Sequence, residues 1–279
     1  MSKIIHDEDI YNITKSINND FKKLKNKKIL LIGYNGFLGK YFVDIFSKFS
    51  KEINFELDCC DNFISSKKNK FKNKRFKYIH GDIVNINLKK KYDLIICLAG
   101  IASPALYKKF PMETLDVSYL GVKKLLNKSK KDKSQFILFS SSEIYGNPDK
   151  KNIPTKESFY GYVNSFGPRA CYDEGKRIGE TLCYIYKTYF NVNIKIIRPF
   201  NVFGPLMAKN QEIADEMIKI KAAIQITSNE SLPHTLEELL NNDTLSKELS
   251  CNARKYAEDG GTILESISLK ISPYIVGIK

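Results

Sequence analysis

The sequence predicts an α/β fold built on a doubly wound parallel sheet, with a helical extension before it and an atypical helical segment after it. Two observations lead to this fold class. Six short apolar runs alternate with helical patterns along the chain, and a glycine-rich turn follows the first run. We therefore divide the chain into an N-terminal helical extension (1–27), a nucleotide-binding domain (28–207) and a helical tail (208–279).

The extension before the sheet reads as an amphipathic helix, because its apolar residues recur at steps of three and four. Asp7 or Asp9 could cap it. The apolar positions of this face are Ile10, Ile13, Ile17, Phe21 and Leu24.

The strand candidates are short runs rich in β-branched, aromatic and leucine residues. Helical patterns lie between them, through Tyr41–Phe46, 112–130 and 169–190. Alternation of this kind favours parallel strands joined by crossover helices. The six runs are 29–32, 55–60, 76–79, 94–98, 136–139 and 194–197.

The character of the chain changes after Pro205. Residues 211–226 look helical and then extended. Two short amphipathic helices follow, the first around Leu236–Leu240 and the second from Leu245 to Tyr256, with Asp243 as the expected cap of the second.

Charge and composition narrow the class of protein. The 279 residues carry a formal charge of +14, but only five of the 45 basic residues are arginine. Readers of nucleic acid use arginine forks, so this lysine-rich charge indicates a polyanionic small molecule rather than DNA or RNA. The basic cluster 67–75 is interpreted as a solvated loop.

The sequence predicts no metal site, disulfide framework, membrane span or secretory signal. The six cysteines show no CxxC spacing and the three histidines are scattered, so no metal site is expected and the thiols should be free. No apolar run is long enough for a membrane span, and no secretory signal opens the chain. The expected compartment is the cytosol.

The strongest local motif follows the first strand and opens a helix. Its spacing, G-x-x-G-x-x-G, is a variant of the dinucleotide fingerprint, in which glycines let the backbone approach a pyrophosphate at a helix N-terminus. We expect cofactor contacts from Gly33, Asn35, Gly36, Phe37, Leu38 and Gly39.

A carboxylate stands where the adenosine ribose of that cofactor would lie. Asp61 ends the second strand, 22 residues beyond Gly39, and a carboxylate there accepts both ribose hydroxyls of NAD. Asp58 is a competitor inside the strand. Asp82 and Ile83, after the third strand, mark a loop expected to contact adenine.

A second constellation can move a proton. Tyr172 and Lys176 lie four residues apart on one helical face, with the serine-rich run Ser140–Glu143 upstream. An ammonium beside a phenol lowers the pKa of the phenol, which would make Tyr172 a base, while a serine hydroxyl holds the substrate oxygen.

These motifs resemble those of the extended short-chain dehydrogenase/reductase family, the NAD-dependent epimerases and dehydratases of nucleotide sugars, and most closely its UDP-glucuronic acid decarboxylases. The resemblance covers roughly residues 28–207. It is carried by the segment Gly161–Arg177, by Ala102-Ser103-Pro104 with Tyr107, by Ser142–Gly146, and by Arg198–Asn201 with Gly204-Pro205.

The resemblance implies a redox-neutral cycle on NAD. Tyr172, assisted by Ser141 and Lys176, would deprotonate the sugar C4 hydroxyl as hydride leaves C4. The 4-ketone of UDP-glucuronate lies β to the C5 carboxylate, so carbon dioxide leaves. The enolate is then reprotonated, and the hydride returned to C4 gives UDP-xylose. Ser142 and Glu143 would lie near the reacting ring.

The resemblance also implies further contacts. Substrate would be held by Ser103, Pro104, Tyr107, Glu143 and Asn201. Cofactor contacts would include Asn62, Leu98, Ala99 and Pro199 as well as Tyr172 and Lys176. A homodimer through the helices 110–130 and 170–190 is expected.

Sister enzymes of the same family remain as alternatives. In 4,6-dehydratases an Asp-Glu pair stands where this chain has Ser142 and Glu143, and 4-epimerases usually carry a small or hydroxyl residue at the Glu143 position, so decarboxylation fits best. Ser118 replaces the family's usual asparagine.

The tail departs from the family. An arginine of the family's substrate lobe has no match after Pro205, where Arg254 is the only arginine and lies in different surroundings. The tail loosely resembles the closing helices of two-domain glycosyltransferases. A catalytically impaired NAD-binding remnant or partner subunit is therefore a second hypothesis.

Overall fold

A computed structural model describes residues 7–69, 71, 73–200, 202, 217–225 and 231–259 of the chain. The chain divides into two compact units, Met1–Met207 and Ala208–Lys279, and each is described by itself.

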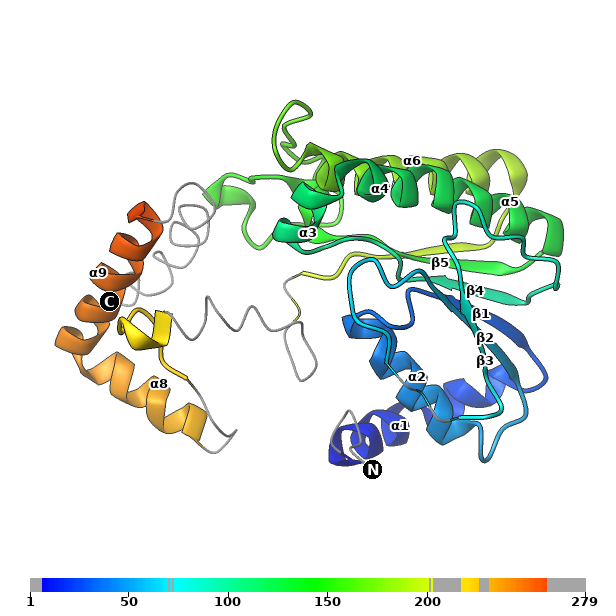
Figure 1. The fold of residues 1–279 in the computed structure, drawn as a ribbon, viewed down its shortest axis with the longest axis horizontal. Helices are drawn as coiled ribbons and strands as arrows, with labels where there is room; N and C mark the ends of the chain where they lie inside the picture. The colour runs from blue at the N-terminus through cyan, green and yellow to red at the C-terminus, as the bar shows by residue number, and fades with distance from the viewer. Residues whose placement is uncertain are drawn as a thin grey trace. The chain divides into compact units, whose positions relative to one another are not determined.

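The first unit is built on a six-stranded parallel sheet, which confirms the predicted fold class (Figure 1). The strand order is β3-β2-β1-β4-β5-β6. Each strand lies within one or two residues of its predicted position. Their bounds are β1 Lys28–Ile32, β2 Glu56–Asp61, β3 Lys77–His80, β4 Leu94–Cys97, β5 Gln135–Phe139 and β6 Ile194–Ile197.

Helices cover both faces of the sheet (Figure 1). One layer holds α1 (Asp7–Phe21), followed by the short 3₁₀ turn Lys22–Leu24, and α2 (Phe37–Phe49). The other holds α4 (Pro111–Asp116), α5 (Val122–Asp132) and α6 (Ala170–Phe190), and the short helix α3 (Pro104–Lys109) precedes α4.

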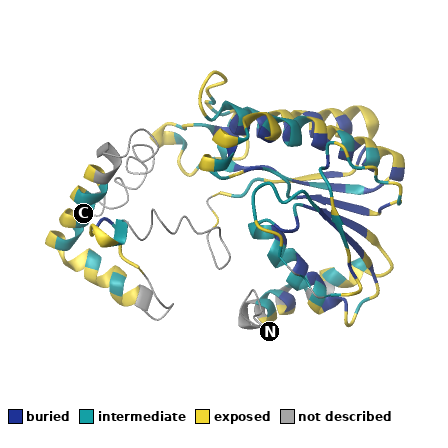
Figure 2. Ribbon diagram, in the orientation of Figure 1, coloured by how far each residue is buried: buried dark blue, intermediate teal, exposed yellow. Residues whose placement is uncertain are grey.

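The alternation of side chains along the buried strands divides the core between these layers. In β1, Ile29 and Leu31 pack with Phe46 of α2, whereas Leu30 and Ile32 pack with Leu125 of α5. Both sets are almost fully buried, as the dark interior of the sheet in Figure 2 shows. One short apolar run therefore anchors two cores.

The N-terminal extension packs on the outside of this fold, as predicted. The ring of Phe21, at the end of α1, stacks on Phe49 of α2 with 3.9 Å between centroids. It also meets Phe46 edge to face. The possible caps Asp7 and Asp9 have side chains outside those described.

The helix predicted over 112–130 is interrupted, which corrects the expectation of one continuous helix. A π-helical turn, Val117–Gly121, separates α4 from α5. Ser118 lies in this turn, and its hydroxyl donates to the Thr114 carbonyl at 3.0 Å. A Cβ added to Gly175 of α6 would stand 3.2 Å from the Ser118 side chain, so the two helices approach closely here.

The order of the strands reverses between β1 and β4, because the chain proceeds outward from β1 to β3 and then crosses to β4. Ligands of open α/β sheets bind at such a switch point, outside the carboxyl ends of the strands. The predicted site residues follow the ends of β1, β2, β3, β4 and β5.

Among its described residues, the second unit contains the predicted helices α8 (Ser231–Asn241) and α9 (Asp243–Asp259), and residues 217–219 are also helical. The expected cap of α9 is wrong by one residue, since the Asn242 side chain accepts from the Leu245 amide at 3.0 Å. Of the prediction for 211–226, residues 211–216 and 226 lie outside the described residues.

Among the described residues, no helix is both long and apolar enough to cross a lipid bilayer.

Candidate functional site

The turn between β1 and α2 brings backbone segments so close that only glycine fits. Gly33 has a φ of +81°, in the region that favours glycine. A Cβ on Gly39 would lie 2.2 Å from the Gly33 carbonyl oxygen. At Gly36 such a Cβ would meet the same oxygen at 3.3 Å and, apart from its own chain neighbours, no other described atom within 4 Å, so this glycine presents open backbone at the N-terminus of α2.

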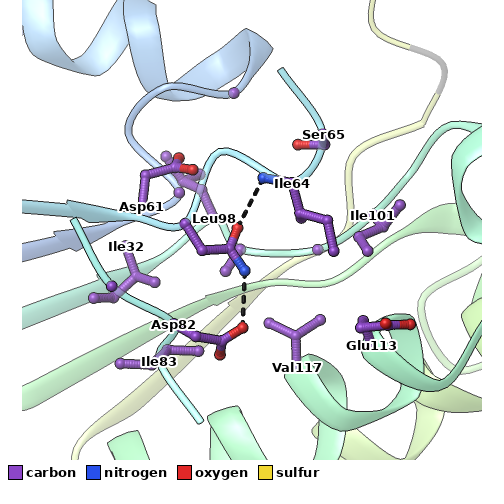
Figure 3. A pocket seen from close by; sticks show the side chains of 16 residues that line it. Ile32, Asp61, Ile64, Ser65, Asp82, Ile83, Leu98, Ile101, Glu113 and Val117 are labelled. Carbon is purple, nitrogen blue, oxygen red and sulfur yellow. Dashed lines mark hydrogen bonds between the residues drawn. The ribbon is translucent and has the colours of Figure 1, made fainter. Parts of the chain in front are cut away.

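A pocket opens beside this turn at the switch point (Figure 3). Its floor comes from Gly33, Gly36 and the Leu98–Ile101 segment after β4, and Asp61 and Asp82 enter from β2 and the loop after β3. Open glycine backbone next to a carboxylate at this place fits a dinucleotide.

Most predicted cofactor residues line this pocket, and several do not. Those that do are Gly33, Gly36, Asp61, Asn62, Asp82, Ile83, Leu98 and Ala99. Asn35, Phe37, Leu38, Gly39 and Pro199 are not among the lining residues, nor are Tyr172 and Lys176. Gly39 acts through the shape of the turn, and the Phe37 ring packs edge to face on Tyr41 of the same helix.

The structure separates the two candidate carboxylates of β2. Asp61 lines the pocket and accepts the Phe63 amide at 2.7 Å and the Asn35 amide at 3.0 Å, one on each oxygen. A carboxylate can accept about four hydrogen bonds, so Asp61 keeps acceptor capacity beyond these amides. Asp58 is buried on the strand and bonds the Tyr92 hydroxyl and the Lys90 ammonium, both at 2.8 Å, so it is structural.

Burial shapes the charge of the pocket carboxylate. It raises the pKa of Asp61 above its ordinary value, although the amides of Phe63, Asn35 and Asn62 and the charge of His80 act in the opposite direction.

The predicted proton-moving pair, Tyr172 and Lys176, is buried in the N-terminal half of α6. Tyr172 and Lys176 are 6% and 7% exposed. The Lys176 ammonium donates to the Phe139 carbonyl at the end of β5, at 2.9 Å, and lies 5.8 Å from the centre of the Tyr172 ring. Burial lowers the pKa of Lys176.

The expected depression of the Tyr172 pKa is not found in this structure. Burial raises the pKa of Tyr172, and the charges of Glu143 and Asp173 raise it further. A hydrogen bond with Ser141 and the charge of Arg169 lower it. The Lys176 ammonium donates to the Phe139 carbonyl, and no hydrogen bond between it and the phenol is formed among the described residues.

Ser141 and Glu143 are positioned by the 3₁₀ turn Ser142–Tyr145, which follows β5. Ser141 is the N-cap of this turn, and its hydroxyl accepts the Glu143 amide at 3.2 Å. The Glu143 carboxylate pairs with the Arg169 guanidinium. The Ser142 amide donates to the Pro199 carbonyl at 2.9 Å, which ties the turn to the end of β6.

Arg169 is a site residue that the sequence prediction missed. It precedes α6 and bridges Glu143 and Asp173, whose Oδ2 lies 3.4 Å from the arginine Nε. The signal was available, because Arg169 is in the segment that carries the family resemblance and lies three residues before Tyr172.

The structure places the predicted substrate residues in different surroundings. Tyr107 of α3 stacks on Tyr172 with 5.5 Å between ring centres, and it is 2% exposed, so it supports the phenol. Ser103 and Pro104 begin α3, where Ser103 is the N-cap residue. Asn201 lies outside the described residues.

In the described part of the chain, no group of three or more histidine, cysteine, aspartate or glutamate side chains could hold a metal ion.

Comparison with known proteins agrees with this geometry. UDP-glucuronic acid decarboxylase 1 of Xenopus tropicalis is 35% identical over 213 residues, which make up 73% of this chain and 49% of that protein. UDP-glucuronic acid decarboxylase 5 of Arabidopsis thaliana is 37% identical over 65% of this chain and 53% of its own length. The chain thus spans about half the length of these relatives.

Solved structures share the fold. An epimerase from Methanothermobacter thermautotrophicus aligns with a TM-score of 0.61 and 23% identity, over 75% of this chain and 62% of its own. A UDP-glucuronic acid 4-epimerase from Bacillus cereus, solved with NAD, aligns with a TM-score of 0.55 and 25% identity, over 70% of this chain and 62% of its own.

The family model described as "NAD dependent epimerase/dehydratase family" matches residues 29–240. That description names NAD, the cofactor predicted from the glycine turn and Asp61. With most of the chain matched and the switch-point pocket formed, the chain belongs to the NAD-dependent epimerase/dehydratase family.

Proposed function

We propose that the chain binds NAD at the switch-point pocket and converts UDP-glucuronate to UDP-xylose and carbon dioxide. The observation that carries the proposal is the gathering of Ser141 and Glu143 beside Tyr172, with the Glu143 carboxylate paired to the Arg169 guanidinium. The decarboxylase relatives support this choice of reaction within the family.

The residues divide the work as follows. Tyr172 takes the proton of the sugar C4 hydroxyl, and the Ser141 hydroxyl holds the same oxygen. The Lys176 ammonium is fixed by its bond to the Phe139 carbonyl, and from there it lies 5.8 Å from the centre of the Tyr172 ring and helps to orient the phenol. When bound, NAD would accept the C4 hydride and later return it. The ketone at C4 is β to the carboxylate, which allows carbon dioxide to leave; a proton then replaces the carboxylate at C5, and the hydride returned to C4 gives UDP-xylose.

Glu143 and Ser142 favour decarboxylation over the sister reactions. A 4,6-dehydratase needs an acid for the departing C6 hydroxyl, and Ser142 cannot serve as one. Glu143 and Arg169 together offer a proton carrier and a cation beside the reacting ring.

A second function rests on the character of the tail. Arg254 is the one arginine after Pro205 in this sequence, and its surroundings differ from those of the arginine in the family's substrate lobe. A chain that binds NAD but does not turn over substrate, acting as a partner subunit, is the alternative to catalysis.

The glycine turn provides a test that separates folding from cofactor binding. Gly39→Ala forces a methyl group against the Gly33 carbonyl, so we expect a loss of about 3 kcal/mol or more in unfolding free energy. The methyl group of Gly36→Ala would lie 3.3 Å from the Gly33 carbonyl oxygen, so this variant should keep the wild-type Tm. The methyl group would cover the open backbone of the turn, so the purified variant should release no NAD when it is denatured. A Gly36→Ala protein that still releases stoichiometric NAD would contradict the proposed cofactor site.

Turnover is tested with UDP-glucuronate and NAD, with carbon dioxide and UDP-pentose as readouts. The wild-type chain should release both, and Tyr172→Phe should be slower by about 10²- to 10⁴-fold, because the base is removed. Exposed Tyr184→Phe is the matched control. NAD binding without product in the wild type would leave the partner-subunit function in its place, and products from other UDP- or dTDP-sugars would indicate an epimerase or dehydratase.

The pH profile tests the role of Arg169. Its charge lowers the pKa of Tyr172, whereas Glu143 and Asp173 raise it, so Arg169→Gln raises the pKa of the phenol. Since the phenolate is the base, the acidic limb of the kcat profile should move to higher pH, and the loss of rate should shrink as pH rises. Arg254→Gln, which removes the same charge from α9, should leave the profile in place. A pH-independent loss in Arg169→Gln would argue against this electrostatic role.

Exposed apolar side chains on α4, the π-helical turn and α6 support a homodimer. Apolar side chains remain exposed along α4, the π-helical turn and α6, and Ile178 and Ile185 lie on one face because they are seven residues apart. The exposed residues are Met112, Leu120, Ile178, Tyr184, Ile185 and Tyr189.

Light scattering after gel filtration should therefore give twice the 32.0 kDa mass of one chain. Ile185→Glu places a charge in the expected interface and should yield monomers, whereas Tyr11→Glu, at an exposed position of α1, should not. A monomeric wild-type protein would rule the dimer out.

A further inference from the structure

The loop after β2 forms one wall of the switch-point pocket, through Ile64 and Ser65 (Figure 3). Its continuation, 66–69, carries the exposed residues Lys67 and Lys68. Neighbouring ammonium groups repel each other, so something other than charge must hold this loop in place.

Asn35 supplies that hold. It is fully buried within the glycine turn. Its amide nitrogen donates to the Ser66 hydroxyl at 2.6 Å and to the Lys67 carbonyl at 3.0 Å. Its oxygen accepts the backbone amide of Asn69 at 3.0 Å and the Asn69 side-chain amide at 3.2 Å.

These four bonds use the two donors and the two lone pairs that an asparagine amide possesses. The Asn35 side chain therefore has no hydrogen-bonding capacity left for a pyrophosphate. Its backbone amide is also engaged, with Asp61. The direct cofactor contact expected of Asn35 is replaced by an indirect role.

Asn62 holds the other end of the loop. Its side chain donates to Asp82 at 2.9 Å and accepts the Ile64 amide at 3.1 Å, the two bonds drawn as dashed lines in Figure 3. The loop is thus fastened on one side to the segment after β3 and on the other to the glycine turn.

We infer that Asn35 is a positioning residue that fixes the 64–69 loop as the wall of the nucleotide pocket before the nucleotide arrives. The inference rests on the proposed NAD site. Ordering a loop during binding lowers affinity, and a loop ordered by the fold avoids that cost. Asn35 then sets cofactor affinity without touching the cofactor.

Limited trypsin digestion tests the loop in the absence of any ligand. The Lys67 carbonyl is bonded to Asn35, so cleavage after Lys67 requires the loop to open. In Asn35→Ala we expect cleavage at this bond to be about tenfold faster, read by mass spectrometry against cleavage after Lys25 in the turn before β1. Asn252→Ala, which removes a side-chain amide bond to the Lys221 carbonyl in the second unit, should digest like wild type at both bonds.

Calorimetric titration with NAD completes the test. Asn35→Ala should bind NAD about tenfold more weakly than wild type, and the double variant Ser66→Ala, Asn69→Ala should reproduce both effects from the loop side if Asn35→Ala does not fold. Unchanged cleavage after Lys67, or faster cleavage with unchanged NAD affinity, would overturn the inference. If wild type binds no NAD, the proposed function fails, and accelerated cleavage alone still decides whether Asn35 holds the loop.

Discussion

The contact between Gly39 and the Gly33 carbonyl is the constraint on which the nucleotide domain depends. Because Gly39 has no Cβ, its backbone can lie against the Gly33 carbonyl, and β1 can turn into α2 within a few residues. That sharp turn leaves the N-terminus of α2 facing the carboxyl edge of the sheet, where the strand order reverses. The pocket, the Asp61 carboxylate and the loop held by Asn35 are all arranged around this one approach of two backbone segments.

Electrostatic balance dominates the other half of the site. Two carboxylates, Glu143 and Asp173, stand next to the phenol of Tyr172 and share the guanidinium of Arg169. Lys176 is buried and bonded to a backbone carbonyl rather than to the phenol. The pKa of Tyr172 is therefore raised first by burial, and then adjusted by charges from the turn after β5 and the start of α6.

Much of the fold could be read from the sequence because its signals are local. The run Ile29–Ile32 is buried on both faces of the sheet, and the spacing of Gly33, Gly36 and Gly39 indicates a tight turn. What could not be predicted depends on partners distant in sequence. The π-helical turn at Ser118 faces a glycine of α6, and the Asn35 side chain is directed by a loop some thirty residues later. The Asn242 cap was missed because Asp243, its neighbour, is an equally good capping residue.

The glycines of α6 have a consequence for how the domain folds. Gly175 and Gly179 let this helix approach Ser118, yet each weakens the isolated helix by about 1 kcal/mol relative to alanine. The segment that carries Tyr172 and Lys176 should therefore be a poor helix by itself and should gain its structure by docking onto the sheet and the π-helical turn. We expect the sheet to assemble first and α6 to form upon it, so that Tyr172 and Lys176 take up their positions only after the rest of the domain is in place.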